Sequence, residues 1–97
     1  MNTRKVYKYE IKIRDDLQEL LIPSGAQLLH VDEQEGDWAN AKIELWALVD
    51  PESPFTTRRF RVYGTGHPIR DVDMAYVGTA QHRTTGLVWH VFEKVNP

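Results

Sequence analysis

Cysteine is absent from this chain of 97 residues. Disulfide bonds, thiolate nucleophiles and cysteine-ligated zinc are therefore excluded. The sequence also lacks an apolar run long enough for a signal peptide or a membrane span, so we expect a cytoplasmic protein with no membrane partner. Neither sign of charge dominates, and the net charge of −2 disfavours nucleic acid as a partner.

Catalytic signatures are equally scarce. The sequence has no Gly-x-Ser-x-Gly motif, and its four histidines lack the close spacing of a metal-binding helix. The triplet His82–Thr84 resembles half of a two-histidine phosphodiesterase site, but His90–Phe92 lacks the threonine that a second half needs. We therefore expect a protein that is not an enzyme and that uses neither a metal nor a cofactor.

The composition that remains is that of an ordinary globular domain. Hydrophobic residues make up 41% of the chain and charged residues 27%, which is typical of folded proteins and not of disordered ones. A chain of this length can form one hydrophobic core but not two. We therefore expect a single domain over residues 1–97.

Alternating apolar and polar residues predict strands along most of the chain. Between Tyr7 and Ile13, aromatic or branched residues occupy every second position and charged residues the positions between them. Residues 17–22 are consistent with either a helical turn or a short strand. Further strands are predicted over residues 26–32, 42–49, 57–64, 74–82 and 87–95.

Turn-forming residues separate these segments, as in Pro23–Gly25 and Asp50–Pro54. We expect an all-β fold of six to seven mostly antiparallel strands in a small sandwich or a partly open barrel, with at most one short helix. The segment at 87–95 is apolar on both faces, which predicts a position in the middle of a sheet or at a subunit contact. The acidic stretch 32–37 and the carboxylates at 15, 16, 71 and 73 fall in predicted turns, where we expect solvation.

The strongest candidate site lies on the strand at 57–64 and the loop after it. Alternation places Arg59, Arg61 and Tyr63 on one face, with Phe60 and Val62 on the other. Guanidinium groups and exposed loop amides are suited to an anionic ligand such as a phosphate. The alternative is that the arginines pair with glutamates across strands while the glycines serve only the turn. The loop residues of the predicted ligand site are Gly64, Thr65, Gly66 and His67.

Aromatic residues on two other strands have more than one interpretation. Trp46 and Trp89 are typical of core positions, yet either could stack on a ligand base. Both of their strands carry apolar residues on each face, and a small domain cannot bury all of them. We therefore expect a homo-oligomer contact formed by some of the residues Trp46, Leu48, Val88, Trp89, His90 and Phe92.

The pattern LWALVDPESP…TRRFRVYGTGHPI, followed by YVGTAQ and LVWHVFE, resembles a family of small bacteriophage- and prophage-encoded proteins of unknown function. The resemblance covers most of the chain. It implies a viral accessory protein in the cytoplasm of a bacterial host, acting by binding a host protein or by sequestering a nucleotide signal of antiviral defence. The alternatives are a protein inhibitor or structural phage component, which would use a strand edge or the 32–37 tip, and a nucleotide phosphodiesterase.

Overall fold

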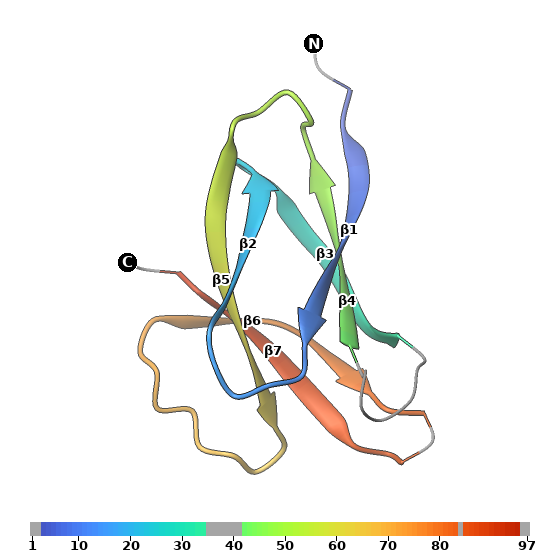
Figure 1. Cartoon of the computed structure of the whole chain (residues 1–97), viewed down its shortest axis with the longest axis vertical. Coiled ribbons are helices and arrows are strands. Elements are labelled where there is room, and N and C mark those ends of the chain that lie inside the picture. Colours follow the sequence, from blue (N-terminus) through green and yellow to red (C-terminus); the bar gives the residue numbers. More distant parts are fainter. Residues whose placement is uncertain (1–2, 35–41, 84, 96–97) are drawn as a thin grey trace.

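The predicted strands are present in the structure. The computed structural model describes residues 3–34, 42–83 and 85–95, which form seven strands and no helix (Figure 1). The all-β prediction is confirmed, and the ambiguous segment at 17–22 belongs to a strand. Within the described ranges, no helix is available that could cross a membrane. The strands are β1 (Lys5–Lys12), β2 (Gln18–Pro23), β3 (Gln27–Gln34), β4 (Lys42–Val49), β5 (Phe55–Gly64), β6 (Met74–Gln81) and β7 (Val88–Lys94).

The strands form two antiparallel sheets. One has three strands in the order β1-β4-β3, and the other has four in the order β2-β5-β7-β6 (Figure 1). The sheets do not close into a barrel, so the sandwich interpretation holds. Strands β4 and β7 each lie between two neighbours, so the prediction that the last strand lies in the middle of a sheet is confirmed.

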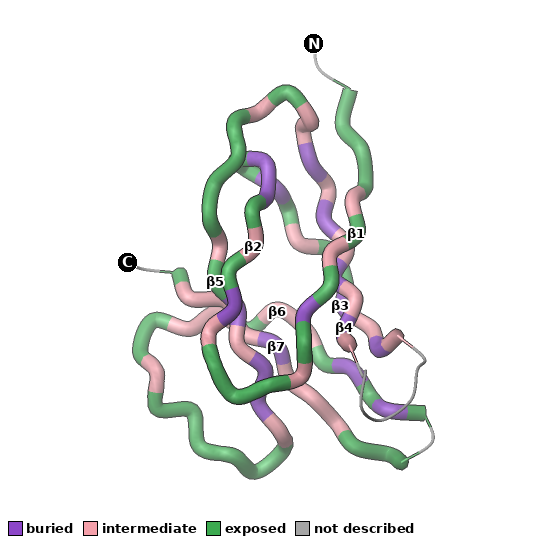
Figure 2. Tube along the Cα trace, in the orientation of Figure 1, coloured by how far each residue is buried: buried purple, intermediate pink, exposed green. Residues whose placement is uncertain are grey.

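One core fills the space between the sheets. Every second residue of β4 is fully buried, and the inner faces of β5 and β7 are buried against the same cluster (Figure 2). Each large side chain of this kind, such as that of Leu45 or Phe60, stabilises the fold by about 1.5–3 kcal/mol relative to exposure. The central residues of this core are Ile43, Leu45, Ala47, Val49, Phe60, Val62 and Val91.

The two sheets approach each other most closely where β3 meets β6. At Gly78, an added Cβ atom would lie only 2.4 Å from Cγ2 of Val31. No side chain larger than hydrogen fits at that distance, so glycine sets the spacing between the two strands. The β6 strand is irregular at the same point, because its register shifts between Tyr76 and Gly78.

A buried polar pair joins β3 to the residue that follows β6. Nε2 of His82 lies 3.2 Å from Oε1 of Glu33, and the side chains are 11% and 5% exposed. The backbone N–H of Thr85 donates to Nδ1 of His82, so the ring faces Glu33 through its other nitrogen, Nε2. The predicted solvated tip at 32–37 is therefore wrong at Glu33, because the carboxylate has a buried partner. Residues 35–37 lie outside the described residues.

The corner between β1 and β2 is held by one side chain. The backbone N–H of Lys12 donates to Oε1 of Gln18 at 2.9 Å, and Nε2 of Gln18 donates back to the Lys12 carbonyl at 2.6 Å. The amide of Gln18 thus acts as a strand partner for the end of β1. This contact fixes both ends of loop 13–17, which contributes one wall of the site described below.

Gly78→Ala is expected to destabilise the domain by about 1–3 kcal/mol, since the new methyl group would overlap the Val31 side chain. Urea unfolding of the wild type and the variant measures the difference. The control is the Val31→Ala/Gly78→Ala double variant, in which removal of the Val31 methyl groups makes room for the new one. The cost of the double variant must then be smaller than the sum of the two single costs; simple additivity would contradict the contact.

Candidate functional site

The last part of β5 has a neighbouring strand on one side only. Strand β2 pairs with β5 from Pro23 opposite Phe55 as far as Gln18 opposite Phe60. Strand β7 continues alongside β5 up to Gly64. The edge of β5 from residue 61 to 64 is therefore flanked by two loops instead of a strand, the β1–β2 loop at 13–17 and the β5–β6 loop at 65–73.

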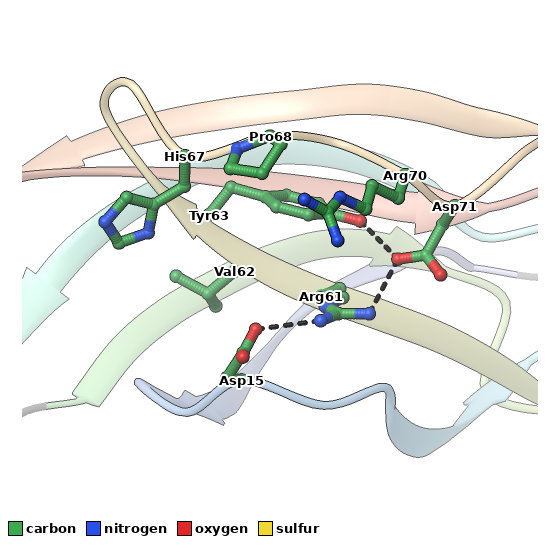
Figure 3. Close-up of a pocket in the computed structure, with 8 residues that line it drawn as sticks. All are labelled: Asp15, Arg61, Val62, Tyr63, His67, Pro68, Arg70 and Asp71. Carbon is green, nitrogen blue, oxygen red and sulfur yellow. Dashed lines mark hydrogen bonds and ion pairs between the residues drawn. The ribbon is translucent and has the colours of Figure 1, made fainter.

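Two adjoining hollows lie along this edge. The first has a volume of about 280 Å³, and the second of about 270 Å³. They share Asp15, Val62 and His67. The first hollow, called the polar cavity here, is lined by Asp15, Arg61, Val62, Tyr63, His67, Pro68, Arg70 and Asp71 (Figure 3). The second, called the tryptophan hollow, is lined by Ile13, Arg14, Asp15, Val62, Gly64, His67 and Trp89.

Arg61 connects the two loops across the polar cavity. Its Nη1 donates to Oδ2 of Asp71 and its Nη2 donates to Oδ1 of Asp15, each at 2.8 Å (Figure 3). Oδ2 of Asp71 also accepts a hydrogen bond of 2.5 Å from the Tyr63 hydroxyl. The guanidinium carbon lies 5.4 Å from the centre of the Tyr63 ring, within the range of a cation–π contact. Loop 65–73 is thereby attached to the outer face of the four-stranded sheet.

The pKa values of these groups follow from the contacts. Burial, followed by the hydrogen bond to Asp71 and its negative charge, raises the pKa of Tyr63 to about 12. The hydrogen bond from Tyr63 is the main reason that the pKa of Asp71 is lowered, and the charge of Arg61 lowers it further. The hydrogen bond to Asp15 raises the pKa of Arg61. Around neutral pH the cavity wall therefore holds a neutral phenol, a carboxylate and a guanidinium ion.

The turn after β5 directs an imidazole ring into both hollows. The backbone N–H of His67 donates to the Gly64 carbonyl at 3.1 Å, and Gly66 has a φ of 85°, which favours glycine. The His67 ring folds back onto Gly64, where an added Cβ atom would lie 2.9 Å from its Cε1. The two glycines therefore have different roles: Gly66 permits the turn, and Gly64 leaves space for the ring.

Arg70 is the cation of the cavity wall that has no acidic partner. It lines the polar cavity, and it forms no hydrogen bond or ion pair with any described residue. The other arginine of the cavity, Arg61, is already shared between two carboxylates. Arg70 and His67 are thus the side chains there that remain available to an anionic ligand.

Two buried N–H groups beside the hollows have no acceptor. They are Nε of Arg61 and Nε1 of Trp89, both of which are inaccessible to solvent and unpaired among the described residues. Buried polar groups of proteins are rarely left without a partner, and each exception calls for an explanation, of which a functional role is one. Both residues line one of the hollows, which marks this edge of β5 as the leading candidate site.

The residues predicted from the sequence are only partly brought together here. Arg61, Tyr63 and His67 line the polar cavity, and Gly64 lines the tryptophan hollow. Arg59 lines neither, because it pairs across the strands with Glu19 at 3.5 Å. Thr65 also points elsewhere, with its hydroxyl 2.8 Å from Nε2 of His90.

The predicted aromatic residues lie on different surfaces. Trp46 pairs in register with Lys8 and His30 on the outer face of the three-stranded sheet, away from the hollows. It therefore cannot stack on a ligand there, whereas Trp89 lines one hollow. His90 and Phe92 pair in register with Tyr63 and Arg61 on the outer face of the other sheet, so Trp46 lies on a different surface from these two residues.

Three side chains of the candidate site were not predicted from the sequence. Arg70 carried no signal, because it lies in a loop without periodicity. Asp71 and Asp15 were expected to be solvated, and for Asp71 this is wrong, because its side chain is only 28% exposed and accepts two hydrogen bonds. The available hint was the long polar loop between Gly64 and Met74, since loops of that length that fold back often carry function.

The chain belongs to the family described as Domain of unknown function (DUF7352), whose model matches residues 2–97. This agrees with the resemblance to a small domain family of unknown function, and the match carries no information on a phage origin. Neither the curated proteins nor the solved structures include a match to the chain.

Tyr63 is expected to ionise after the other tyrosines, with a pKa near 12. This pKa is raised above the unfolded value of about 10, so the protonated Tyr63 hydroxyl stabilises the folded domain. That contribution is complete below about pH 10 and is lost as the pH rises through about 12. The pKa of Tyr63 is measured from the near-ultraviolet absorbance of phenolate during an alkaline titration. Tyr63→Phe should remove the absorbance change that occurs at the highest pH, and Asp71→Asn should move that change to lower pH.

The matched control for that titration is Asp16→Asn, which removes an equal charge from a carboxylate paired with Arg14 and absent from both hollows. The control should leave the absorbance change at the highest pH unaffected. Simultaneous ionisation of all tyrosines in the wild type would contradict the described burial and hydrogen bonding of Tyr63.

Proposed function

We propose that this domain is a non-enzymatic binding protein that captures a small molecule through a phosphate group in the polar cavity. The observation that carries the proposal is the position of Arg70, a guanidinium on the cavity wall without an acidic partner. Arginine donors match phosphate oxygens in geometry and charge. The imidazole of His67 lines the same cavity and adds a second donor.

The charges of the cavity wall favour a ligand of low charge. Arg61 and Arg70 are balanced in number by Asp15 and Asp71, so the charges of these four side chains cancel. Both carboxylates are engaged by Arg61, which leaves the charge of Arg70 for the ligand. One phosphate monoester or diester suits this balance better than a chain of phosphates.

The neighbouring hollow supports a ligand that has a ring beside its phosphate. The polar cavity alone lies just below the usual size of small-molecule sites, and the two hollows together, at about 280 and 270 Å³, fall within it. Ile13, Val62 and Trp89 give the tryptophan hollow an apolar wall. An aromatic side chain of this kind can pack against a base, so we propose a mononucleotide as the ligand class.

The biological setting belongs to the same proposal. The resemblance to phage and prophage proteins supports action in a bacterial cytoplasm, where capture of a nucleotide signal would counter antiviral defence. A homo-oligomer also stays part of the proposal, with the contact on the His90 and Phe92 face or on the Trp46 face.

Arg70→Ala is expected to weaken the binding of adenosine monophosphate by about 10- to 100-fold, the usual effect of losing a charged hydrogen bond. Isothermal titration calorimetry with adenosine monophosphate, its 3′,5′-cyclic form and adenosine measures the affinity and the need for the phosphate. Adenosine should bind much more weakly than either nucleotide.

The control variant is Arg59→Ala, which removes an equal charge from strand β5, at a residue that lines neither hollow. It should bind within about twofold of the wild type, because distant surface charges act only through screened electrostatics. Equal losses in the two variants would show that net charge and not the cavity determines binding. No binding of any nucleotide would overturn the proposed function.

A further inference from the structure

The two carboxylates that hold Arg61 are bound very differently. Asp71 is 28% exposed, and its Oδ2 accepts hydrogen bonds from both Arg61 and Tyr63. Asp15 is 93% exposed, and its only hydrogen bond or ion pair within the described residues is the one with Nη2 of Arg61. Asp71 is therefore a fixed part of the scaffold, whereas Asp15 can leave at little cost, since exposed ion pairs contribute little to stability.

The position of Asp15 is one that a ligand anion would need. It lines both hollows, and Figure 3 shows its carboxylate directed at the Nη2 end of Arg61, on the opposite side from Asp71. A carboxylate and a phosphate present similar oxygen acceptors to a guanidinium group. The hydrogen-bonding end of Arg61 that is not committed to the scaffold is thus covered by an internal anion.

We infer that the phosphate of the ligand binds where the Asp15 carboxylate lies, replacing Asp15 at Nη2 of Arg61 while Asp71 stays in place. This inference rests on the proposed function and names the binding position within it. Arg61 becomes a ligand-binding residue when Asp15 withdraws, alongside Arg70 and His67 on the same wall. Loop 13–17 is then released from β5 at this point, because the Arg61 contact is the one that Asp15 makes.

Asp15 lowers the affinity in two ways according to this inference. In the molecules in which Asp15 occupies Nη2 of Arg61, the phosphate cannot bind there. The apparent affinity is therefore lowered in proportion to the fraction of molecules in which Arg61 is free to bind. The displaced carboxylate also stays near the incoming phosphate and repels it. Asn at position 15 keeps the size of the side chain and removes both effects, so binding should become about three- to tenfold tighter.

The test compares Asp15→Asn with Glu19→Gln by calorimetric titration with adenosine monophosphate. The two variants carry the same change in net charge, but Glu19 pairs with Arg59, and neither of these two residues lines a hollow. Asp15→Asn should tighten binding by about three- to tenfold, and Glu19→Gln should stay within about twofold of the wild type. Thermal unfolding of both variants verifies that the fold is kept.

Binding that is unchanged or weaker in Asp15→Asn, with a wild type that binds, overturns this inference and leaves the proposed function standing. An equal gain in both variants also overturns it, since the effect would then be one of net charge. Absence of binding in the wild type and in both variants overturns the proposed function together with the inference. A gain confined to Asp15→Asn supports both.

Discussion

The site depends on one interaction, in which a single carboxylate oxygen of Asp71 accepts two hydrogen bonds. Through it, loop 65–73 is tied to both Tyr63 and Arg61 on β5. The contact gives a partner to the hydroxyl of Tyr63, a residue that is only 5% exposed, and to the charge of Arg61. It also places Pro68 and Arg70 along the wall of the polar cavity. A loop without this attachment would leave the edge of β5 flat and open.

The arginines on and beside β5 have two different roles: those of β5 hold the structure together, and another stays available to a ligand. The arginines of β5 are all paired with carboxylates: Arg58 with Glu93, Arg59 with Glu19 and Arg61 with two aspartates. Of the arginines that line the polar cavity, Arg70 is the one without an acidic partner among the described residues, and it lies on a loop beside the strand. A rigid sheet that positions a functional loop is a common division of labour in β proteins.

Much of the fold could be predicted because its pattern has a period of two. The buried residues of β4 alternate strictly, and the pairing of His90 with Thr79 follows from a short hairpin. The site was harder to predict, because its contacts join residues 8 and 46 positions apart, Tyr63 with Asp71 and Arg61 with Asp15. Loop conformation sets such contacts, and alternation carries no information about it. Arg59 was included for that reason, and Arg70 was missed.

The most direct test of the central claim is a titration of isotopically labelled protein with adenosine monophosphate, followed by nitrogen–proton correlation spectra. The account predicts shifts confined to loop 13–17, residues 61–71 and the indole N–H of Trp89, together with a change at the Arg61 Nε–H. Shifts centred on the Trp46 face, or none at saturating nucleotide, would contradict a phosphate site on the free edge of β5.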